Sequence, residues 1–140
     1  MKVVIDSNRV LAAMIKDSTT RGILLDIFFE FVAPDFIITE IRKHENRVLD
    51  AAEINKGEFE MILALIFERI TITPETEYRE FIEPLKDDIE DPKDLPYMAA
   101  SLASKAHGIW THDPDFDKQN VIKIFSNIDM LRLSGKAKSD

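Results

Sequence analysis

Short runs of β-branched residues alternate with amphipathic stretches along all 140 residues of the chain, and this alternation strongly limits its fold. The first run, residues 3–5, is continuously apolar, as expected for a strand that is covered on both faces. Strands that alternate with helices from end to end are typical of a parallel sheet with helices on both faces. We therefore predict the α/β class, and within it an α/β/α sandwich with a central parallel sheet of about five strands.

Individual elements follow from the local patterns and from the polar residues that interrupt them. The expected strands are residues 3–5, 31–33, 70–72, 109–111 and 121–125. The expected helices are residues 8–15, 21–29, a segment that begins after Asp35, 45–52, 56–67 and 94–106. Gly57 is expected at the turn between residues 45–52 and 56–67. We expect one domain over residues 1–133 and a flexible, frayed tail over residues 134–140.

Composition excludes several kinds of functional site. The chain has no cysteine, which excludes a disulfide scaffold, thiolate zinc sites, iron–sulfur clusters and cysteine nucleophiles. Its three histidines are scattered, and no glycine-rich phosphate loop is present. The net charge of −8 argues against a broad basic surface for nucleic acids.

Hydropathy gives no sign of a membrane or secretory segment. No apolar run approaches the roughly 18 residues that a transmembrane helix needs. A secretory signal would require a longer apolar stretch than the N-terminal residues provide, together with a small-residue cleavage site. We therefore expect a soluble, cytoplasmic protein with no membrane partner.

Four acidic residues are expected at one edge of the sheet. Asp6 directly follows the first strand, and Asp113 comes two residues after the fourth. Glu40 lies on the helix after the second strand, and Asp94 lies in the first turn of the helix before the fourth. Because sites in such sheets lie beyond the carboxyl ends of the strands, we expect these four acids to converge on one crevice.

Convergence of carboxylates has an electrostatic cost. Two carboxylates ~5 Å apart repel by about 3 kcal/mol at an effective dielectric constant of ~20. Either some of the acids are protonated, or cations neutralise them. Carboxylates without cysteine or histidine partners suit Mg²⁺ or Mn²⁺. One or two such ions are the candidate cofactor, because a pair about 3.5–4 Å apart can activate water against a phosphodiester.

Four short motifs resemble, in order, those of the PIN-domain ribonucleases. Residues 3–8 (VVIDSN) are similar to the strand and Asp-x-Asn that open these enzymes, and residues 39–41 (TEI) to their second acidic position. Residues 91–100 (DPKDLPYMAA) resemble the third motif, an acid before an alanine-rich helix. Residues 110–116 (WTHDPDF) resemble the fourth, Thr-x-Asp followed by an acid–aromatic pair. The resemblance covers about residues 2–128.

This resemblance implies roles for individual side chains. The implied catalytic residues, which would also bind the metal, are Asp6, Glu40, Asp94 and Asp113. The expected supporting residues are Asn8, Thr111, Asp115 and Asp117, and the expected contacts to RNA phosphates are Arg9, Arg42 and Lys93. Two points stay open: which acids among residues 113, 115 and 117 bind metal, and whether Asp91 or Asp94 caps the following helix. Arg9 and His112 depart from the pattern, since an aliphatic residue and a small or polar residue are usual there.

The function implied by the resemblance is a metal-dependent endoribonuclease that hydrolyses single-stranded or loop RNA. A homodimer is also implied, as is either RNA processing or a role as the toxin of a toxin–antitoxin pair, with an antitoxin protein as partner. The short helices near Leu11, Ile15, Leu24 and Phe28 carry more apolar residues than one sheet face requires, which favours self-association.

Two other functions compete with this one. A degenerate PIN domain would act only as a module that binds protein or RNA, although the presence of all four acids argues against it. A receiver-type signalling domain would need an acceptor aspartate after the third strand, where this chain has Thr73 and Pro74.

Overall fold

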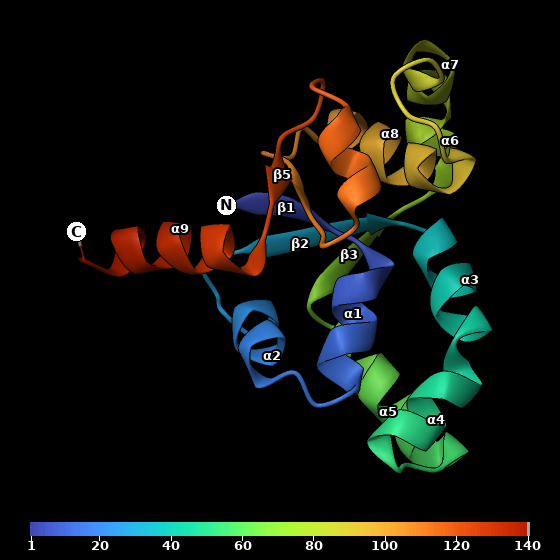
Figure 1. The fold of residues 1–140 in the computed structure, drawn as a ribbon, viewed down its shortest axis with the longest axis vertical. Helices are drawn as coiled ribbons and strands as arrows, with labels where there is room; N and C mark the ends of the chain where they lie inside the picture. The colour runs from blue at the N-terminus through green and yellow to red at the C-terminus, as the bar shows by residue number, and fades with distance from the viewer. Residues whose placement is uncertain (140) are drawn as a thin grey trace.

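Five parallel strands form one sheet in the order β3-β2-β1-β4-β5 (Figure 1). They are β1 (Lys2–Ile5), β2 (Glu30–Pro34), β3 (Ile70–Thr73), β4 (Ile109–Trp110) and β5 (Ile124–Phe125). The computed structural model describes the backbone of residues 1–139 and the side chains of residues 1–135. The predicted α/β/α sandwich around a sheet of about five parallel strands is confirmed.

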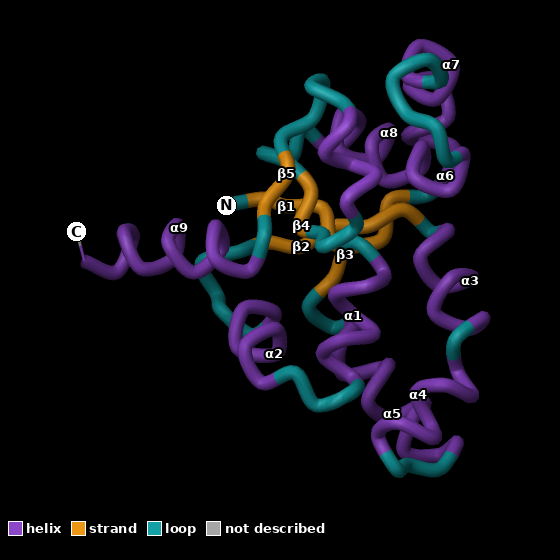
Figure 2. The backbone as a smooth tube through the Cα atoms, viewed as in Figure 1, coloured by secondary structure: helices purple, strands orange, loops and turns teal. Residues whose placement is uncertain are grey.

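Helices cover both faces of this sheet (Figures 1 and 2). The α-helices are α1 (Ser7–Met14), α2 (Ser18–Leu24), α3 (Phe36–Lys43), α4 (Glu45–Ala52), α5 (Lys56–Phe67), α6 (Glu75–Tyr78), α7 (Ile82–Leu85), α8 (Leu95–Ser104) and α9 (Asn127–Ser139). The short 3₁₀ helices are η1 (Arg79–Phe81), η2 (Pro92–Asp94) and η3 (Pro114–Lys118). Helices α6 to α8 lie on one side of the sheet, and α1, α2, α4 and α5 lie on the other. Within residues 1–139, none of the helices combines the length and apolarity that crossing a membrane requires.

The strand order creates the position at which a site can form. β1 is central, with β2 and β3 on one side of it and β4 and β5 on the other. The chain therefore changes direction across the sheet between β1 and β4, and a crevice opens beyond the carboxyl ends of strands at such a switch point. This order also rules out the receiver-type alternative, since that fold orders its strands 2-1-3-4-5.

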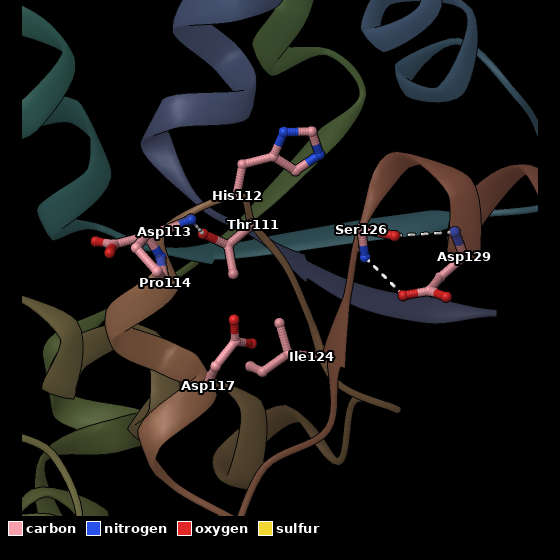
Figure 3. A pocket seen from close by; sticks show the side chains of 8 residues that line it. All are labelled: Thr111, His112, Asp113, Pro114, Asp117, Ile124, Ser126 and Asp129. Atoms are coloured by element: carbon pink, nitrogen blue, oxygen red, sulfur yellow. Dashed lines mark hydrogen bonds between the residues drawn. The ribbon is translucent and has the colours of Figure 1, made fainter.

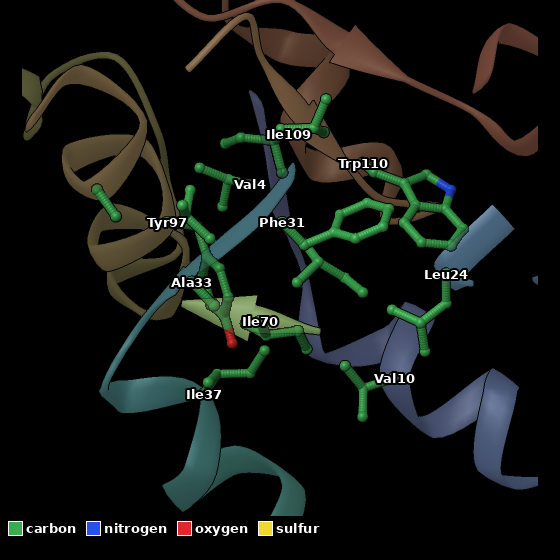
Figure 4. Close-up of a cluster of buried hydrophobic side chains, with 14 of the residues drawn as sticks. Val4, Val10, Leu24, Phe31, Ala33, Ile37, Ile70, Tyr97, Ile109 and Trp110 are labelled. Carbon is green, nitrogen blue, oxygen red and sulfur yellow. The ribbon is translucent and has the colours of Figure 1, made fainter. Parts of the chain in front are cut away.

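Large apolar side chains from β1, β2 and β4 fill the core around the central strands (Figure 4). Val3, Val4 and Ile5 are fully buried, which accounts for the uninterrupted apolar run in the sequence. The Phe31 and Trp110 rings pack with their centroids 5.5 Å apart. Burial of a large apolar side chain stabilises a fold by roughly 1.5–3 kcal/mol, so this core holds the carboxyl edge of the sheet rigidly.

The bounds of α2 and the position of Gly57 differ from the sequence prediction. α2 begins at Ser18, where the carboxylate of Asp17 accepts from the backbone N–H of Thr20 (3.0 Å), and it ends at Leu24 instead of residue 29. Gly57 lies inside α5 and not at the preceding turn. That turn uses Glu53 in the left-handed conformation (φ 55°), followed by Asn55, whose side chain caps α5.

β5 is also shorter than predicted. The side-chain oxygen of Gln119 accepts from the backbone N–H groups of Val121 (2.9 Å) and Ile122 (2.8 Å). These amides are therefore engaged in a local turn, and the strand begins only at Ile124.

The C-terminal segment differs from the predicted frayed tail. The backbone of residues 134–139 continues α9, while residue 140 lies outside the described residues. Met130 is fully buried, and the hydroxyl of Ser134 donates to the carboxylate of Asp26. These contacts attach the helix to the domain beyond residue 133.

The apolar residues predicted to form a surplus surface belong to the core instead. Leu11 and Leu24 are buried, and Ile15 and Phe28 pack against the core cluster. These four side chains therefore do not themselves form a surplus surface, although Leu25 and Ile27 beside them are 66% and 91% exposed. An apolar hollow of about 320 Å³ lies between α2 and α5, lined by Ala13, Arg21, Leu24, Leu25, Ile62, Leu65 and Ile66.

Gly108, just before β4, is predicted to tolerate no side chain. A Cβ atom there would lie 2.3 Å from the backbone oxygen of Lys123 and 2.8 Å from the Phe125 ring. We expect Gly108→Ala to destabilise the protein by about 2 kcal/mol or more, as overpacking does in a rigid core. The control is Gly22→Ala in α2, where a Cβ meets nothing within 4 Å and alanine should stabilise by about 0.5–1 kcal/mol. Urea denaturation measures both; equal stability of the two variants would contradict the close approach.

Candidate active site

The candidate site lies at the switch point, where β1 and β4 end. Asp6 is the first residue after β1 and caps α1, and its backbone N–H donates to the oxygen of Trp110 (3.1 Å). Thr111 is the first residue after β4. Both side chains are buried, Asp6 at 6% exposure. The ladder between these two strands thus fixes the backbone on either side of the site.

Three donors hold the Asp6 carboxylate. Its Oδ1 accepts from the backbone N–H of Ser7 (2.8 Å). Its Oδ2 accepts from the Thr111 hydroxyl (2.7 Å) and from the Asn8 amide (3.1 Å). Asn8 and Thr111, both predicted to support Asp6, therefore contact it directly and set the direction of its free lone pairs.

Glu40 reaches the site from α3 through a partner that the sequence analysis missed. Its Oε1 accepts from the hydroxyl of Tyr97 and, at 3.4 Å, from the hydroxyl of Ser7. Tyr97 lies on α8 and is buried, and burial raises the pKa of its hydroxyl well above the ordinary value. The hydroxyl therefore stays protonated and available as a donor. The sequence could have indicated this contact, because Tyr97 lies within an apolar helix and a buried tyrosine hydroxyl normally requires a hydrogen-bond partner.

Asp94 sits at the end of η2, where α8 begins, and its side chain is buried at 6% exposure. Among the described side chains, its Oδ2 is the buried polar side-chain atom without a hydrogen-bond partner. The capping role falls to Asp91, which accepts from the backbone N–H of Lys93 (3.0 Å). Asp94 is therefore free of the capping bond that was the alternative explanation for an acid at this position.

The three acids after β4 occupy different environments. Asp113 is half-buried; it caps η3 by accepting from the backbone N–H of Asp115 (3.0 Å). One carboxylate oxygen each from Asp91, Asp94 and Asp115 lie within 4.8 Å of one another. Asp117 is exposed and lines a cavity beside Asp113 (Figure 3). Asp91, considered only as a cap from the sequence, thus joins Asp94 and Asp115 in a group able to hold a cation.

Burial and neighbouring acids raise the pKa values of Asp6 and Asp94. Burial raises the pKa of Asp6 to about 6, with further increases from the charges of Glu40 and Asp113, while the bonds from Thr111 and Ser7 oppose them. Burial also raises the pKa of Asp94 to about 7, and there the charges of Asp113, Asp91, Asp6 and Asp115 add to it in that order. Glu40 and Asp113 therefore act on Asp6, and Asp113 and Asp6 act on Asp94, so each of the four predicted acids lies near at least one other. Of the four, Asp94 belongs to the group whose oxygens lie within 4.8 Å of one another.

Two of the three basic residues predicted to contact phosphates are engaged within the protein. Arg9 is buried, and Arg42 forms ion pairs with Glu45 (3.1 Å) and Glu60. Lys93 is exposed on η2, next in sequence to Asp94. The expected phosphate contacts stay predictions: Arg9 is mostly buried, and Arg42 is exposed but already paired with two glutamates.

A cavity of about 380 Å³ adjoins the site (Figure 3). It is lined by Thr111, His112, Asp113, Pro114, Asp117, Ile124, Ser126 and Asp129. The Nε2 atom of His112 accepts from the backbone N–H of Asn127 (3.2 Å), and partial burial and the charge of Arg9 lower the pKa of its ring. His112 is therefore a neutral acceptor in this arrangement.

The donor set fits a hard divalent cation. Every candidate ligand is a carboxylate oxygen, which is the ligand type that Mg²⁺ and Mn²⁺ prefer. The buried Oδ2 of Asp94 has no hydrogen-bond partner and lies in a group with oxygens of Asp91 and Asp115, of which Asp115 is also 3.7 Å from the Lys118 ammonium. A cation would satisfy the oxygen of Asp94.

Comparisons with known proteins agree with this geometry. A family model described as PIN domain matches residues 4–124, a span that includes every acidic residue of the site. A search of curated proteins gives no match to this chain.

The raised pKa values predict how stability depends on pH. Near pH 4 the unfolded chain begins to ionise Asp6 and Asp94, whereas the folded protein keeps them protonated until about pH 6 and 7. Stability of the cation-free protein should therefore fall between about pH 4 and 7, with Asp94 alone contributing on the order of 3 kcal/mol. Urea denaturation in EDTA at pH 5 and pH 8 measures this fall.

Asp94→Asn should reduce the difference in stability between the two pH values, because asparagine does not ionise. Asp50→Asn on α4, an exposed position, should keep the wild-type difference. An Asp94→Asn protein with the full wild-type pH dependence would contradict the assignment.

Proposed function

The chain belongs to the PIN-domain family, and on this premise we propose that it is a metal-dependent endoribonuclease that hydrolyses single-stranded or loop RNA. PIN domains are generally nucleases. The observation that carries the proposal is the buried, unpartnered oxygen of Asp94 within a group of three carboxylates. A protein that only binds partners gains nothing from such an unstable arrangement, which argues against the degenerate alternative.

We assign metal binding to Asp6, Glu40, Asp94 and Asp113, with Asp91 and Asp115 completing the group around Asp94. A bound Mg²⁺ or Mn²⁺ would supply Lewis-acid stabilisation of the phosphate and would lower the pKa of a water nucleophile. The protein's own contribution is orientation. Asn8 and Thr111 direct the Asp6 carboxylate, and Tyr97 directs Glu40.

Protons held by the acids couple cation binding to pH. In the cation-free protein Asp94 keeps a proton up to about pH 7. A cation must displace this proton in order to bind, so apparent affinity should increase as the pH rises through that range.

The charge distribution supports a substrate that is bound weakly. The net charge is −8, Arg9 is buried, and the exposed Arg42 is paired with Glu45 and Glu60, while Lys93 is exposed. Few phosphate contacts mean modest affinity and a shallow salt dependence. The cavity beside Asp113 supports a position for a nucleotide that flanks the cleaved phosphate.

We also propose a biological setting. The chain would act as the toxin of a toxin–antitoxin pair, with an antitoxin protein as its partner, or in RNA processing. Expression in a bacterial host distinguishes these roles: a toxin would arrest growth, Asp6→Asn would not, and a cognate antitoxin would relieve the arrest.

Substitution of the proposed ligands tests the enzymatic function. We expect Asp6→Asn, Asp94→Asn and Asp113→Asn each to lower Mn²⁺-dependent cleavage of a mixed RNA pool by at least ~100-fold while the fold is kept. Asp115→Asn should also lower it, since Asp115 shares the carboxylate group with Asp94. Exposed Asp50→Asn is the matched control and should cleave like the wild type.

The assay includes EDTA and a DNA pool of the same sequences. Cleavage that persists in EDTA, or in the Asp94→Asn protein, would overturn the proposed metal site. Cleavage of DNA alone would overturn the proposed substrate.

Self-association is the second part of the proposal that can be tested directly. We place the surface of a homodimer at the hollow between α2 and α5, where Leu25 and Leu65 are 66% and 57% exposed. Leu65→Glu should shift the protein from dimer to monomer in sedimentation velocity, because a charge would be buried in the interface. Val121→Glu, at an exposed apolar position outside the hollow, is the control. A wild-type monomer would refute the dimer.

A further inference from the structure

Arg9 is unusual because its charge lies inside the protein. Its exposure is 8%, and among the side chains of residues 1–135 no other lysine or arginine is buried. Burial of a guanidinium without bonding partners costs several kcal/mol, so such a group persists only where partners satisfy it. The position follows directly on Asn8, which contacts Asp6.

Side chains from two other helices bond the guanidinium. Its Nη1 donates to the Thr20 hydroxyl on α2 and to the Asn127 side-chain oxygen on α9, both at 3.4 Å. Asn127 is itself fixed, since its oxygen accepts from the Trp110 indole (2.9 Å) and its amide donates to Thr20 (3.1 Å). The guanidinium is therefore attached to a frame made by α2, β4 and α9.

A further donor of Arg9, its Nε, reaches Asn8. Arg9 Nε donates to the side-chain oxygen of Asn8 (2.9 Å). The amide nitrogen of Asn8 then donates to Asp6 Oδ2 and to the Thr111 hydroxyl oxygen, both at 3.1 Å. An Asn amide can turn over, exchanging its oxygen and nitrogen. If Asn8 did so here, its oxygen would face the Asp6 carboxylate and its NH₂ group would face the N–H of Arg9. Arg9 therefore allows only the orientation that donates to Asp6.

We infer that Arg9 is a positioning residue: through Asn8 it fixes the direction of the Asp6 carboxylate for cation binding. The inference rests on the proposed function, since it concerns the same site. It assigns Arg9 a role different from the phosphate contact expected from the sequence. It also makes the first residue of α9 part of the site's support, because Asn127 holds Arg9 in place.

Arg69 provides the contrast with an arginine that acts only in the fold. It donates to the backbone oxygens of Leu24 (3.2 Å), Asp26 (3.0 Å) and Phe29 (3.4 Å), and to none of the residues of the site. Loss of either guanidinium should lower stability. Only loss of Arg9 should change the affinity of the Asp6 site for a cation.

The test measures Mn²⁺ affinity by titration calorimetry without RNA, for the wild type, Arg9→Met, Asn8→Ala, the double variant and Arg69→Met. Partners behind a metal ligand typically contribute roughly 10-fold to 100-fold in affinity, and we expect a loss in that range for Arg9→Met. The double variant should bind no more weakly than Asn8→Ala, because Arg9 acts through Asn8. Arg69→Met should melt at a lower temperature but bind Mn²⁺ like the wild type.

Each outcome decides between the alternatives. Arg9→Met that binds Mn²⁺ like the wild type, or losses in Arg9→Met and Asn8→Ala that simply add, would overturn the inference and leave the proposed nuclease intact. A wild-type protein that binds no Mn²⁺ would overturn both. If Arg9→Met does not fold, Arg9→Lys decides. Lysine keeps the charge but lacks the planar fork, so weakened binding with normal melting supports the inference, and wild-type affinity overturns it.

Discussion

The Asp6 carboxylate is held inside the protein by the geometry of the sheet, and the arrangement of the site follows from that constraint. Its backbone joins a fully buried strand to α1 and is bonded to Trp110, so the side chain cannot move into water. The charges of Glu40 and Asp113 act on it there. Ser7, Asn8 and Thr111 surround it with donors that offset part of the cost. The loops after β1 and β4 are therefore shaped around one buried charge.

Asp94, unlike Asp6, has a carboxylate oxygen that no hydrogen-bond donor satisfies. Its buried oxygen has no donor, although the neighbouring backbone N–H of Lys93 bonds to Asp91. A buried polar atom without a partner lowers stability by about 1–3 kcal/mol, and such costs persist where the surrounding structure is rigid enough to impose them. The aromatic core around Phe31 and Trp110 provides that rigidity directly beneath the strands that carry the site. Packing of the core beneath the sheet thus offsets the stability that the buried oxygen of Asp94 costs at its edge.

Local pattern was enough to predict most of the elements and the edge at which the acids meet. The helices over residues 45–52 and 56–67 and the first three strands follow from periodicity alone. Asp6 and Asp113 could be placed together because the carboxyl ends of parallel strands share an edge. The predicted bounds were wrong where a side chain bonds backbone groups that a strand or helix would otherwise use. Before β5, for example, the Gln119 side chain accepts from the backbone N–H groups of Val121 and Ile122.

Contacts between distant segments could not be predicted in this way. Tyr97 and Glu40 are 57 residues apart, and Arg9 and Asn127 are 118 apart. Nothing in the local sequence distinguishes an arginine that will be buried from one that faces solvent, and exposure is the ordinary expectation for arginine. The role of Arg9 depends on the Asn8 amide, which lies between Arg9 and Asp6 in the folded protein.

Electrostatics also implies an order of binding, if the proposed function holds. The acids and the net charge of −8 repel a phosphate, and Arg9, at 8% exposure, donates through its Nε to Asn8. Without a cation, a phosphodiester at this edge would face Asp6, Asp94 and Asp113, with the exposed lysines Lys93 and Lys118 on the neighbouring helices η2 and η3. Each divalent cation offsets two of these negative charges and so lowers the repulsion of a phosphate, and on the proposed function we therefore expect the cation to bind before the RNA. Orientation of the Asp6 carboxylate therefore matters for the first binding step as well as for hydrolysis, and Arg9 and Asn127 act before the substrate arrives.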